Sequence, residues 1–341
     1  MSRARRYAQL SSAVRCFKAD LLQRHQIERL AEAGSLSETT SLLAAGQLSS
    51  SGTELSSVEA HLFNRVFDLT KRLISYAPPA SKPLLKLSSA KYEFECAKQV
   101  LKSILYQVDA EEALKHIIPA GRFAIERCKE LIEARDTSRV IDTFGDEALK
   151  RFISPKLTGE RDGVAVVSAV DRYYYSRLWA LCNLCDLLDA QVARALIGEM
   201  IDHMNILVAF RSRLFGLDRK STSELLIPVN YHLGNALTEL AETGSLPNII
   251  GILDSTPYAH PLEATKISSD ESLGEVELAL SRSHLATCLN MFAGSPFHIG
   301  LALSFLIIKN YELHDLFRIL NGKANNVPSE RVLSSLILRG P

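Results

Sequence analysis

Two cysteines in the segment Cys182-Asn-Leu-Cys185 are the first residues whose spacing could do chemistry. Two thiols at this spacing can act as a redox dithiol or supply half of a zinc site. A structural zinc site needs four ligands, and the sequence has neither a second such pair nor two histidines at metal-ligand spacing. The surrounding WALCNLCDLL has the pattern of a buried helix, where free cysteine packs as a small hydrophobic residue. We therefore expect both cysteines to be structural, with no metal site and no cofactor.

Three acidic residues, Glu93, Asp202 and Glu312, are candidates for acid–base chemistry, and they lie 109 and 110 positions apart. A general acid and a general base must converge on one site. The even spacing instead predicts one carboxylate in each of three similar units, where it pairs with a neighbouring helix or caps a helix. The sequence also has no P-loop, no GxGxxG or GxSxG motif and no Asp-rich run for magnesium pyrophosphate. We expect no catalytic residue, and we disfavour the alternative of an all-helical prenyl-transfer enzyme.

A basic cluster in the segment RSRLFGLDRK is the candidate partner interface. Its cations could contact acidic loops of a partner or lipid headgroups. A solvated helix end is the alternative, because cations favour the C-terminal end of the helix dipole. Both interpretations stay open at this point. The candidate interface residues are Arg211, Arg213, Arg219 and Lys220.

The elements that position these residues are predicted to be helices nearly everywhere. Apolar residues recur at three- and four-residue spacing, and no sustained alternation indicates a strand. We expect an all-α protein with short connections. Clusters of Gly, Pro and Ser predict loops at residues 46–52, 76–83, 154–163 and 254–261.

A repeated phrase predicts how the helices are organised. LAEAGSL at 30–36 and LAETGSL at 240–246 share six of seven residues, and LIEARDT at 131–137 lies 109 positions before the second of them. We expect each version to end a helix. Two Ile-Pro pairs, Ile118-Pro119 and Ile227-Pro228, are also 109 positions apart. Proline suits the first helical turn, so these pairs are predicted to open helices.

Each of the three acidic residues opens an apolar stripe at positions i, i+3 and i+7, which is one face of a helix. In this register Asn205 aligns with Cys96 and Asp315, and the chain reads as three diverged copies of one helical unit. The predicted domains are residues 1–115, 116–225 and 226–341, with approximate boundaries and terminal helices free to exchange between domains.

Composition narrows the class of partner. The chain has 39 basic and 39 acidic side chains, so its formal net charge is zero, which argues against broad nucleic-acid binding. The longest apolar run, IGLALSFLII, falls short of the roughly 20 residues of a spanning helix. The start MSRARRYAQL lacks the apolar stretch of a signal peptide. Six scattered cysteines fit a reducing compartment, so we expect a cytoplasmic protein, and a peripheral place on a membrane complex stays open.

The ordered set of motifs resembles the C subunits of A-type ATP synthases, the counterparts of the d subunits of V-type ATPases. The best-matching stretches are IDHMNILVAFRSRLFG at 201–216 and FLIIKNYELHDLFRILNGKANNVPSERV at 305–332. The opening helix is similar through Tyr7 and Arg15. The first copy departs most, because Cys96 stands for the Asn and Lys98 stands where the other copies are apolar. Residues carried over as a structural signature are Glu93, Asp202, Asn205, Glu312, Asp315 and Arg318.

This resemblance implies a funnel of three six-helix domains about a pseudo-threefold axis. It further implies a non-catalytic rotor subunit at the cytoplasmic face of the membrane, joining the membrane proteolipid ring to the central stalk and transmitting torque coupled to transport of protons or sodium ions. It implies no small-molecule substrate. The alternative is a helical scaffold with an unrelated protein partner, which the triplication alone would permit.

Overall fold

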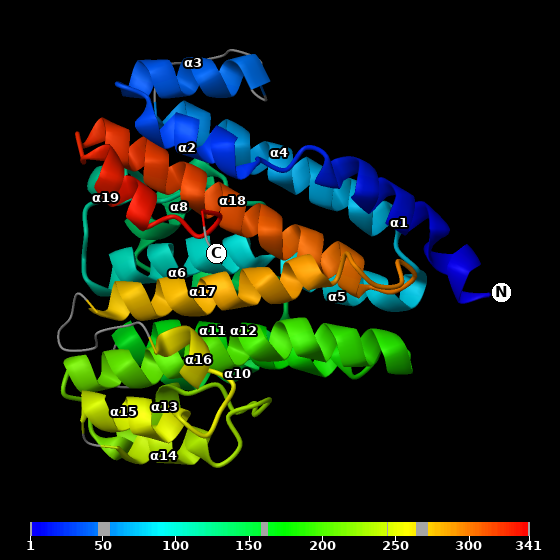
Figure 1. Ribbon diagram of the computed structural model, residues 1–341. Helices are drawn as coiled ribbons and strands as arrows, with labels where there is room; N and C mark the ends of the chain where they lie inside the picture. The colour runs from blue at the N-terminus through cyan, green and yellow to red at the C-terminus, as the bar shows by residue number, and fades with distance from the viewer. Residues whose placement is uncertain (1, 47–54, 158–162, 244, 264–271, 340–341) are drawn as a thin grey trace. The chain divides into compact units, whose positions relative to one another are not determined.

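The computed structural model describes residues 2–46, 55–157, 163–243, 245–263 and 272–339, and every regular element within them is a helix (Figure 1). The only strand-like pairing within these ranges is an isolated bridge between Ala120 and Phe123. The expectation of an all-α protein is confirmed. None of the helices in these ranges is both long enough and apolar enough to cross a membrane.

The chain divides into two compact units. Unit 1 contains Met1–Leu85, Cys185–Leu196 and Tyr258–Pro341, and unit 2 contains Lys86–Leu184 and Ile197–Pro257. Helices α5 (Lys82–Ser89) and α12 (Leu187–Leu214) each begin in unit 1 and end in unit 2.

Unit 1 is built around helix α18 (Gly300–Ala324), most of whose residues are buried. It packs against α1 (Arg3–Lys18), α4 (Leu55–Tyr76) and α17 (Ser272–Asn290), which lie along it in Figure 1. The remaining helices of the unit are α2 (Arg24–Glu32), α3 (Leu36–Gly46), η1 (Pro79–Ser81), α16 (Ala259–Leu262) and α19 (Ser329–Ser334).

Unit 2 is centred on the packing of α6 (Lys91–Leu105) against α11 (Gly163–Cys182). Phe94 on α6 fills the core between Phe144 and Tyr174, with ring centroids 4.6 and 4.9 Å away. Aromatic side chains at this spacing contribute both buried area and favourable ring geometry. The other helices of the unit are α7 (Ala110–Leu114), α8 (Ile125–Ala134), α9 (Thr137–Asp142), α10 (Glu147–Leu157), α13 (Arg219–Leu225), α14 (Ala236–Glu242) and α15 (Leu246–Leu253).

The repeated phrase has the same local structure at all three places. It ends α2 at Glu32, α8 at Ala134 and α14 at Glu242. The residue five positions after its first leucine then caps the next helix by accepting the backbone N–H three residues ahead. These pairs are Ser35 with Glu38, Asp136 with Arg139 and Ser245 with Asn248. Ser and Asp are preferred at this cap position, so the phrase encodes one helix end and the following helix start.

Three loop predictions need correction. The segment at 254–261 runs into the short helix α16, which begins at Ala259. The segment at 154–163 is helical as far as Leu157, because α10 continues through Pro155. The segment at 76–83 contains the short helix η1 and the first turn of α5. The predicted loop at 46–52 lies outside the described residues, apart from Gly46 at the end of α3.

Candidate functional site

Asn205, on α12 in unit 2, is fully buried and holds a stretch of backbone through three hydrogen bonds. Its Oδ1 accepts the Ile227 N–H at 2.8 Å, and its Nδ2 donates to the carbonyl oxygens of Ile227 and Val229 at 3.1 and 3.4 Å. One turn earlier on the same helix, the buried carboxylate of Asp202 accepts the N–H groups of Tyr231 and His232 at 3.4 and 2.6 Å. We call such a side chain, bonded to backbone more than 20 positions ahead, a clasp.

The clasps overturn the prediction that the Ile-Pro pairs open helices. The helices after them begin at Ala236 and Ile125, well beyond Pro228 and Pro119. A residue before proline disfavours the helical region, and at Pro228 the chain makes a tight turn in which the Val229 N–H donates to the Ile227 carbonyl oxygen at 2.8 Å. The Asn205 side chain satisfies the polar backbone groups of Ile227, so this segment needs no helix to be buried.

Unit 2 contains a second clasp, on α6. Glu93 accepts the Arg122 N–H at 3.3 Å and forms an ion pair with the Arg122 side chain at 3.5 Å. The sequence separation of this hydrogen bond is 29, the same as that between Asp202 and Tyr231. Gly121 is required beside it, because its φ is +54° and a Cβ there would meet the Glu93 carboxyl oxygen at 1.8 Å.

Unit 1 contains the corresponding side chains on α18. Asp315 accepts the N–H groups of Ile337 and Leu338 at 2.9 and 2.8 Å, and Arg318 donates to the Ser335 carbonyl oxygen. The separation of 22 positions between Asp315 and Ile337 equals that between Asn205 and Ile227.

Glu312 differs from the other acidic residues, because the backbone that it binds precedes it in the chain. It accepts the Leu22 N–H at 2.8 Å, just before α2, and pairs with Lys309 at 2.5 Å in a buried ion pair. Lys309 also donates to the Asp20 carbonyl oxygen at 3.3 Å. Glu93, Asp202 and Glu312 therefore all bind backbone immediately ahead of a helix that ends in the repeated phrase.

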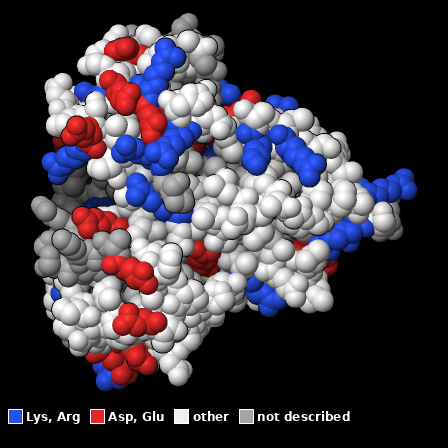
Figure 2. Space-filling view, in the orientation of Figure 1, with Lys and Arg blue, Asp and Glu red and all other residues white. Residues whose placement is uncertain are grey.

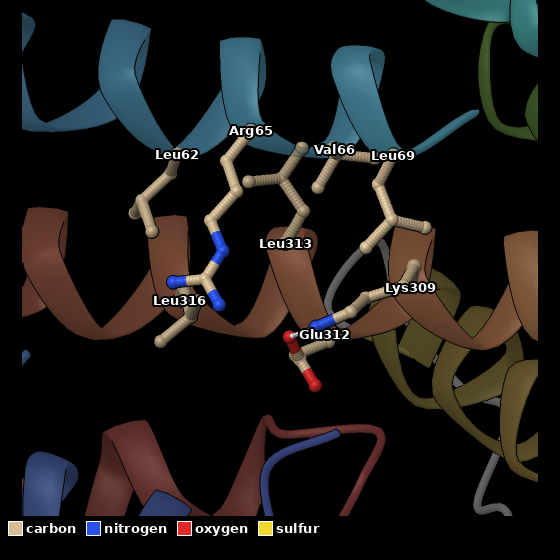
Figure 3. Close-up of a pocket in the computed structure, with 8 residues that line it drawn as sticks. All are labelled: Leu62, Arg65, Val66, Leu69, Lys309, Glu312, Leu313 and Leu316. Carbon is tan, nitrogen blue, oxygen red and sulfur yellow. Dashed lines mark hydrogen bonds and ion pairs between the residues drawn. The ribbon is translucent and has the colours of Figure 1, made fainter. Parts of the chain in front are cut away.

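A cavity of about 20 Å³ lies between α4 and α18, next to Lys309 and Glu312 (Figure 3). Leu62, Val66 and Leu69 of α4 line it, and Arg65 reaches from α4 towards α18. This volume holds about one water molecule, so this cavity is too small for an organic cofactor.

The Asp315 clasp makes the stability of the protein depend on pH. Burial raises the pKa of Asp315 to about 6, against the bonds from Leu338 and Ile337 and the charges of Arg318 and Arg282, which lower it. An acid whose folded pKa lies above its unfolded value binds its proton more tightly when folded, so stability falls as pH rises through the window between the two values.

We expect wild-type protein to lose about 2 kcal/mol of unfolding free energy, relative to Asp315→Asn, between pH 4.5 and pH 7. Denaturant titrations of both proteins at the two pH values measure this difference. Asp186→Asn is the matched control. Burial opposes the shift, but the hydrogen bond from Arg3 leaves the pKa of Asp186 below its ordinary value. The contribution of Asp186 to the free energy of unfolding therefore changes only at lower pH. The prediction would be contradicted if the difference in unfolding free energy between wild type and Asp315→Asn were the same at pH 4.5 and pH 7, as is expected for Asp186→Asn.

Four chain segments of unit 1 meet at a buried cluster around Asp189, which is 2% exposed. The Asp189 carboxylate accepts from Arg3 at 2.5 Å, from the Tyr7 hydroxyl and from the Ile299 N–H at 2.9 Å. The Tyr7 hydroxyl also lies 2.9 Å from the Ser81 hydroxyl. Burial and the bond to Asp189 raise the pKa of Tyr7, so its hydroxyl stays protonated. We call Arg3, Tyr7, Ser81, Asp189 and Ile299 the helix-start junction.

The helix-start junction joins α1 to the beginnings of α5, α12 and α18. Asp189 and Ile299 are separated by 110 positions, one period of the predicted repeat. Gly300 lets α18 approach α12 closely, because a Cβ there would lie 2.1 Å from Cγ1 of Val192. Sequence reasoning missed Asp189. Its partners, on α1 and just before α18, lie far away in the sequence, so no local pattern pointed to it.

Beside the junction, the first turn of α12 exposes apolar side chains. Leu187 is 76% exposed, and Leu188 is also exposed. Arg5 and Arg6 of α1 are exposed too, and Arg6 forms an ion pair with Asp186 at 3.3 Å. An exposed apolar group with basic neighbours has the composition of an interaction surface.

The predicted basic cluster is partly engaged within unit 2. Arg213 donates to the Thr222 hydroxyl, and Arg219 pairs with Glu242 of α14. Arg211 is half-buried, whereas Lys220 is exposed. Phe215, in the turn between α12 and α13, is 77% exposed, and the sequence interpretation did not single it out.

Charge and cysteines add little to the site. On the face drawn in Figure 2, acidic and basic side chains are interspersed among broad uncharged areas. Lys98 is buried and pairs with Asp171 and Glu95 at 2.7 and 2.9 Å.

Cys182 is buried at the end of α11, and Cys185 is partly buried. Within the described ranges, no three His, Cys, Asp or Glu side chains group as metal ligands.

The described residues therefore form an all-helical protein in which the buried carboxylates of Asp202 and Asp315 bind backbone N–H groups. The family model described as ATP synthase (C/AC39) subunit matches residues 10–334. The chain belongs to this family, and the resemblance seen in the sequence is confirmed.

Similar proteins cover almost the whole chain. The A-type ATP synthase C subunit of Methanocaldococcus jannaschii is 24% identical, covering 97% of this chain and 86% of the relative. Its counterpart in Methanococcoides burtonii is 24% identical over 97% of this chain and 94% of the relative. The C subunit of Methanosarcina acetivorans is 25% identical and covers 97% of this chain and 93% of the relative.

Proposed function

We propose that this chain is a non-catalytic rotor subunit of an A-type or V-type ATP synthase or ATPase. In this role it links the membrane proteolipid ring to the central stalk and passes on torque coupled to transport of protons or sodium ions. The observation that carries the proposal is the family match over residues 10–334, together with relatives named as C subunits of A-type ATP synthases. The chain would work at the cytoplasmic face as a peripheral protein, with neither nucleic acid nor a small molecule as its partner.

The helical architecture is suited to transmitting torque, because bending a long helix is opposed wherever its side chains are fixed. Helix α12 is bonded near its start through Asp189 and in its second half through Asp202 and Asn205. Helix α18 is bonded through its preceding residue Ile299 and, in its second half, through Asp315. The bonds to the carboxylates of Asp189, Asp202 and Asp315 are charge-assisted, and such bonds are stronger than neutral ones.

The proposal includes the triplication, with copies at about 1–115, 116–225 and 226–341. Equal separations support it: 22 positions for the Asn205 and Asp315 clasps, and 29 for those of Glu93 and Asp202. The common cap geometry of the three phrases supports it as well. Three similar units would suit contact with a ring of identical proteolipids.

The proposed contact surfaces are the apolar first turn of α12 at Leu187 and the basic cluster. In the cluster, Lys220 and Phe215 are exposed, whereas Arg213 and Arg219 are engaged within the chain and orient the segment. Arg211 completes the proposed interface.

Affinity purification of the tagged chain from its own membranes in mild detergent, with mass spectrometry of the recovered proteins, tests the proposal. We expect a small proteolipid, central-stalk proteins and the nucleotide-binding head. Leu187→Glu and the Phe215→Glu, Lys220→Glu double variant are each expected to reduce recovery of one partner by at least about 10-fold, because a charge buried in an interface core costs more than truncation. Phe152→Glu, at another exposed aromatic residue, is the control. Recovery of none of these proteins, with a stable unrelated partner instead, would identify a helical scaffold.

A further inference from the structure

Two buried cysteines of unit 2 face each other across two helices. Cys96 on α6 and Cys128 on α8 have their sulfur atoms 3.6 Å apart, and the two residues are 2% and 0% exposed. They are separated by 32 positions, so the CxxC pattern that drew attention to Cys182 and Cys185 does not reveal them. Since a disulfide has an S–S distance of about 2.05 Å, the two sulfurs lie in van der Waals contact, close to bonding distance.

These thiols occupy the place of a clasp. Cys96 aligns with Asn205 and Asp315, which hold backbone 22 positions ahead. The Cys128 thiol donates to the Phe123 carbonyl oxygen at 3.6 Å, whereas the N–H groups of Ala120 and Phe123 bond each other's carbonyl oxygens. Thiols are weak donors and weak acceptors, so the two sulfurs add less to this segment than an amide or a carboxylate would.

We propose that Cys96 and Cys128 are a redox modification site, at which a peroxide converts the two thiols into a disulfide that ties α6 to α8. Each thiol loses one hydrogen, the pair gives up two electrons, and the peroxide O–O bond is broken. One molecule of hydrogen peroxide and two thiols thus give one disulfide and two molecules of water. A dithiol reductant reverses the reaction by thiol–disulfide exchange.

The two sulfurs have different roles in this reaction. The hydrogen bond from Cys96 lowers the pKa of Cys128, against its burial, whereas the same bond and burial raise the pKa of Cys96. The Cys96 thiol lies 3.6 Å from the Cys128 sulfur and can donate a hydrogen bond to a Cys128 thiolate. Cys128 is therefore the nucleophile that attacks peroxide and becomes the sulfenic acid, with loss of hydroxide that leaves as water. The Cys96 thiol then attacks the Cys128 sulfur, and the second water leaves as the disulfide forms.

Burial of the two thiols limits the rate of their oxidation and selects for small oxidants. Neither thiol is exposed, so hydrogen peroxide must enter through local opening of α8, and a bulky alkylating reagent is excluded for longer. Cys16 is exposed and provides the internal comparison. The disulfide closes a long loop, which stabilises a folded chain mainly by restricting the unfolded one. It would also replace the weak thiol clasp with a covalent one.

Peptide mapping of the purified, fully reduced chain tests the proposal. The folded protein is treated with hydrogen peroxide, unfolded in iodoacetamide and digested. We expect the Cys96 and Cys128 peptides as a cross-linked pair that is two hydrogens lighter than their sum. We also expect Tm to rise by roughly 5 °C and to return to its starting value after dithiothreitol treatment. Neither Cys96→Ala nor Cys128→Ala should show a peroxide-dependent rise.

Recovery of Cys96 and Cys128 as separate alkylated peptides, after Cys16 has been fully oxidised, would overturn the proposal. Separate sulfinic acids at these positions, or a disulfide to any other cysteine, would also overturn it. The mapping compares treated with untreated wild-type protein, so it stands even where an alanine variant folds poorly. It is also independent of which complex the chain joins.

Discussion

Replacing Asp189 with alanine is expected to lower the free energy of unfolding by about 3–5 kcal/mol, because it breaks a buried ion pair and leaves its partners without an acceptor. The substitution removes the acceptor of Arg3, of the Tyr7 hydroxyl and of the Ile299 N–H together. Urea denaturation of the full chain measures the loss. Hydrogen exchange of α1 should rise in the same variant, because Arg3 and Tyr7 connect that helix to α12.

Asp186→Asn is the matched control for this experiment. Asp186 also binds Arg3, at 2.7 Å, but its side chain is 36% exposed, and an exposed ion pair contributes little. We expect a change below about 1 kcal/mol. A double-mutant cycle of Asp189→Ala with Tyr7→Phe should be clearly non-additive, because the two side chains share one hydrogen bond. Equal effects of Asp189→Ala and Asp186→Asn would contradict a central role for the helix-start junction.

Replacing Asn205 with alanine is expected to cost about 2–4 kcal/mol, since it removes the acceptor of the buried Ile227 N–H and the side-chain donor to the Val229 carbonyl oxygen, and it creates a cavity. The Ile227 carbonyl oxygen keeps the Val229 N–H as a donor. The exchange of the Ile227 amide hydrogen should become much faster, because its acceptor is lost. Equilibrium denaturation and hydrogen exchange followed by mass spectrometry measure the two effects.

The Asn205→Asp variant separates the effect of the hydrogen bond that Asn205 accepts from the effect of the two that it donates. It keeps an acceptor for the Ile227 N–H, as Asp315 does for Ile337, but it replaces both donated bonds by a carboxylate facing two carbonyl oxygens. We expect this variant to be destabilised at neutral pH and partly restored by protonation at low pH. Asn183→Ala, at an exposed position, should leave stability unchanged. An Asn205→Ala variant with full protection of Ile227 would show that the segment is held by packing alone.

Periodic features were predictable from the sequence, and tertiary contacts were not. The spacing of apolar residues predicted the helices, and the repeated phrase predicted three helix ends. Both signals depend on residues that lie within a few positions of one another. The prediction that the Ile-Pro pairs open helices was wrong. It used the preference of proline for helix starts, whereas at Ile227 the Asn205 side chain of α12 bonds the backbone in place of a helix.

The candidate site could be predicted only as a set of positions. The sequence marked Glu93, Asp202, Asn205 and Glu312 through their register but could not reveal their backbone partners, which lie 22 to 290 positions away. Asp189 carried no local signal at all, since its partners come from α1 and from the residue before α18. For the basic cluster, the sequence left a partner interface and a solvated helix end as alternatives. It could not reveal the ion pair between Arg219 and Glu242, because that pair depends on how α13 meets α14.

The hydrogen bond that Glu312 accepts from the Leu22 N–H joins two segments of unit 1 that are far apart in the sequence. We call this contact the seam. Where Glu93 and Asp202 bind backbone that follows them along the same stretch of chain, Glu312 binds backbone near the opposite terminus, 290 positions away. Arg339 adds an ion pair to Glu28 on α2 at 3.5 Å across the same seam. These two bonds join segments that are far apart in the sequence, so they close unit 1 only after most of the chain has been made. Folding of unit 1 during synthesis is therefore expected to be completed late.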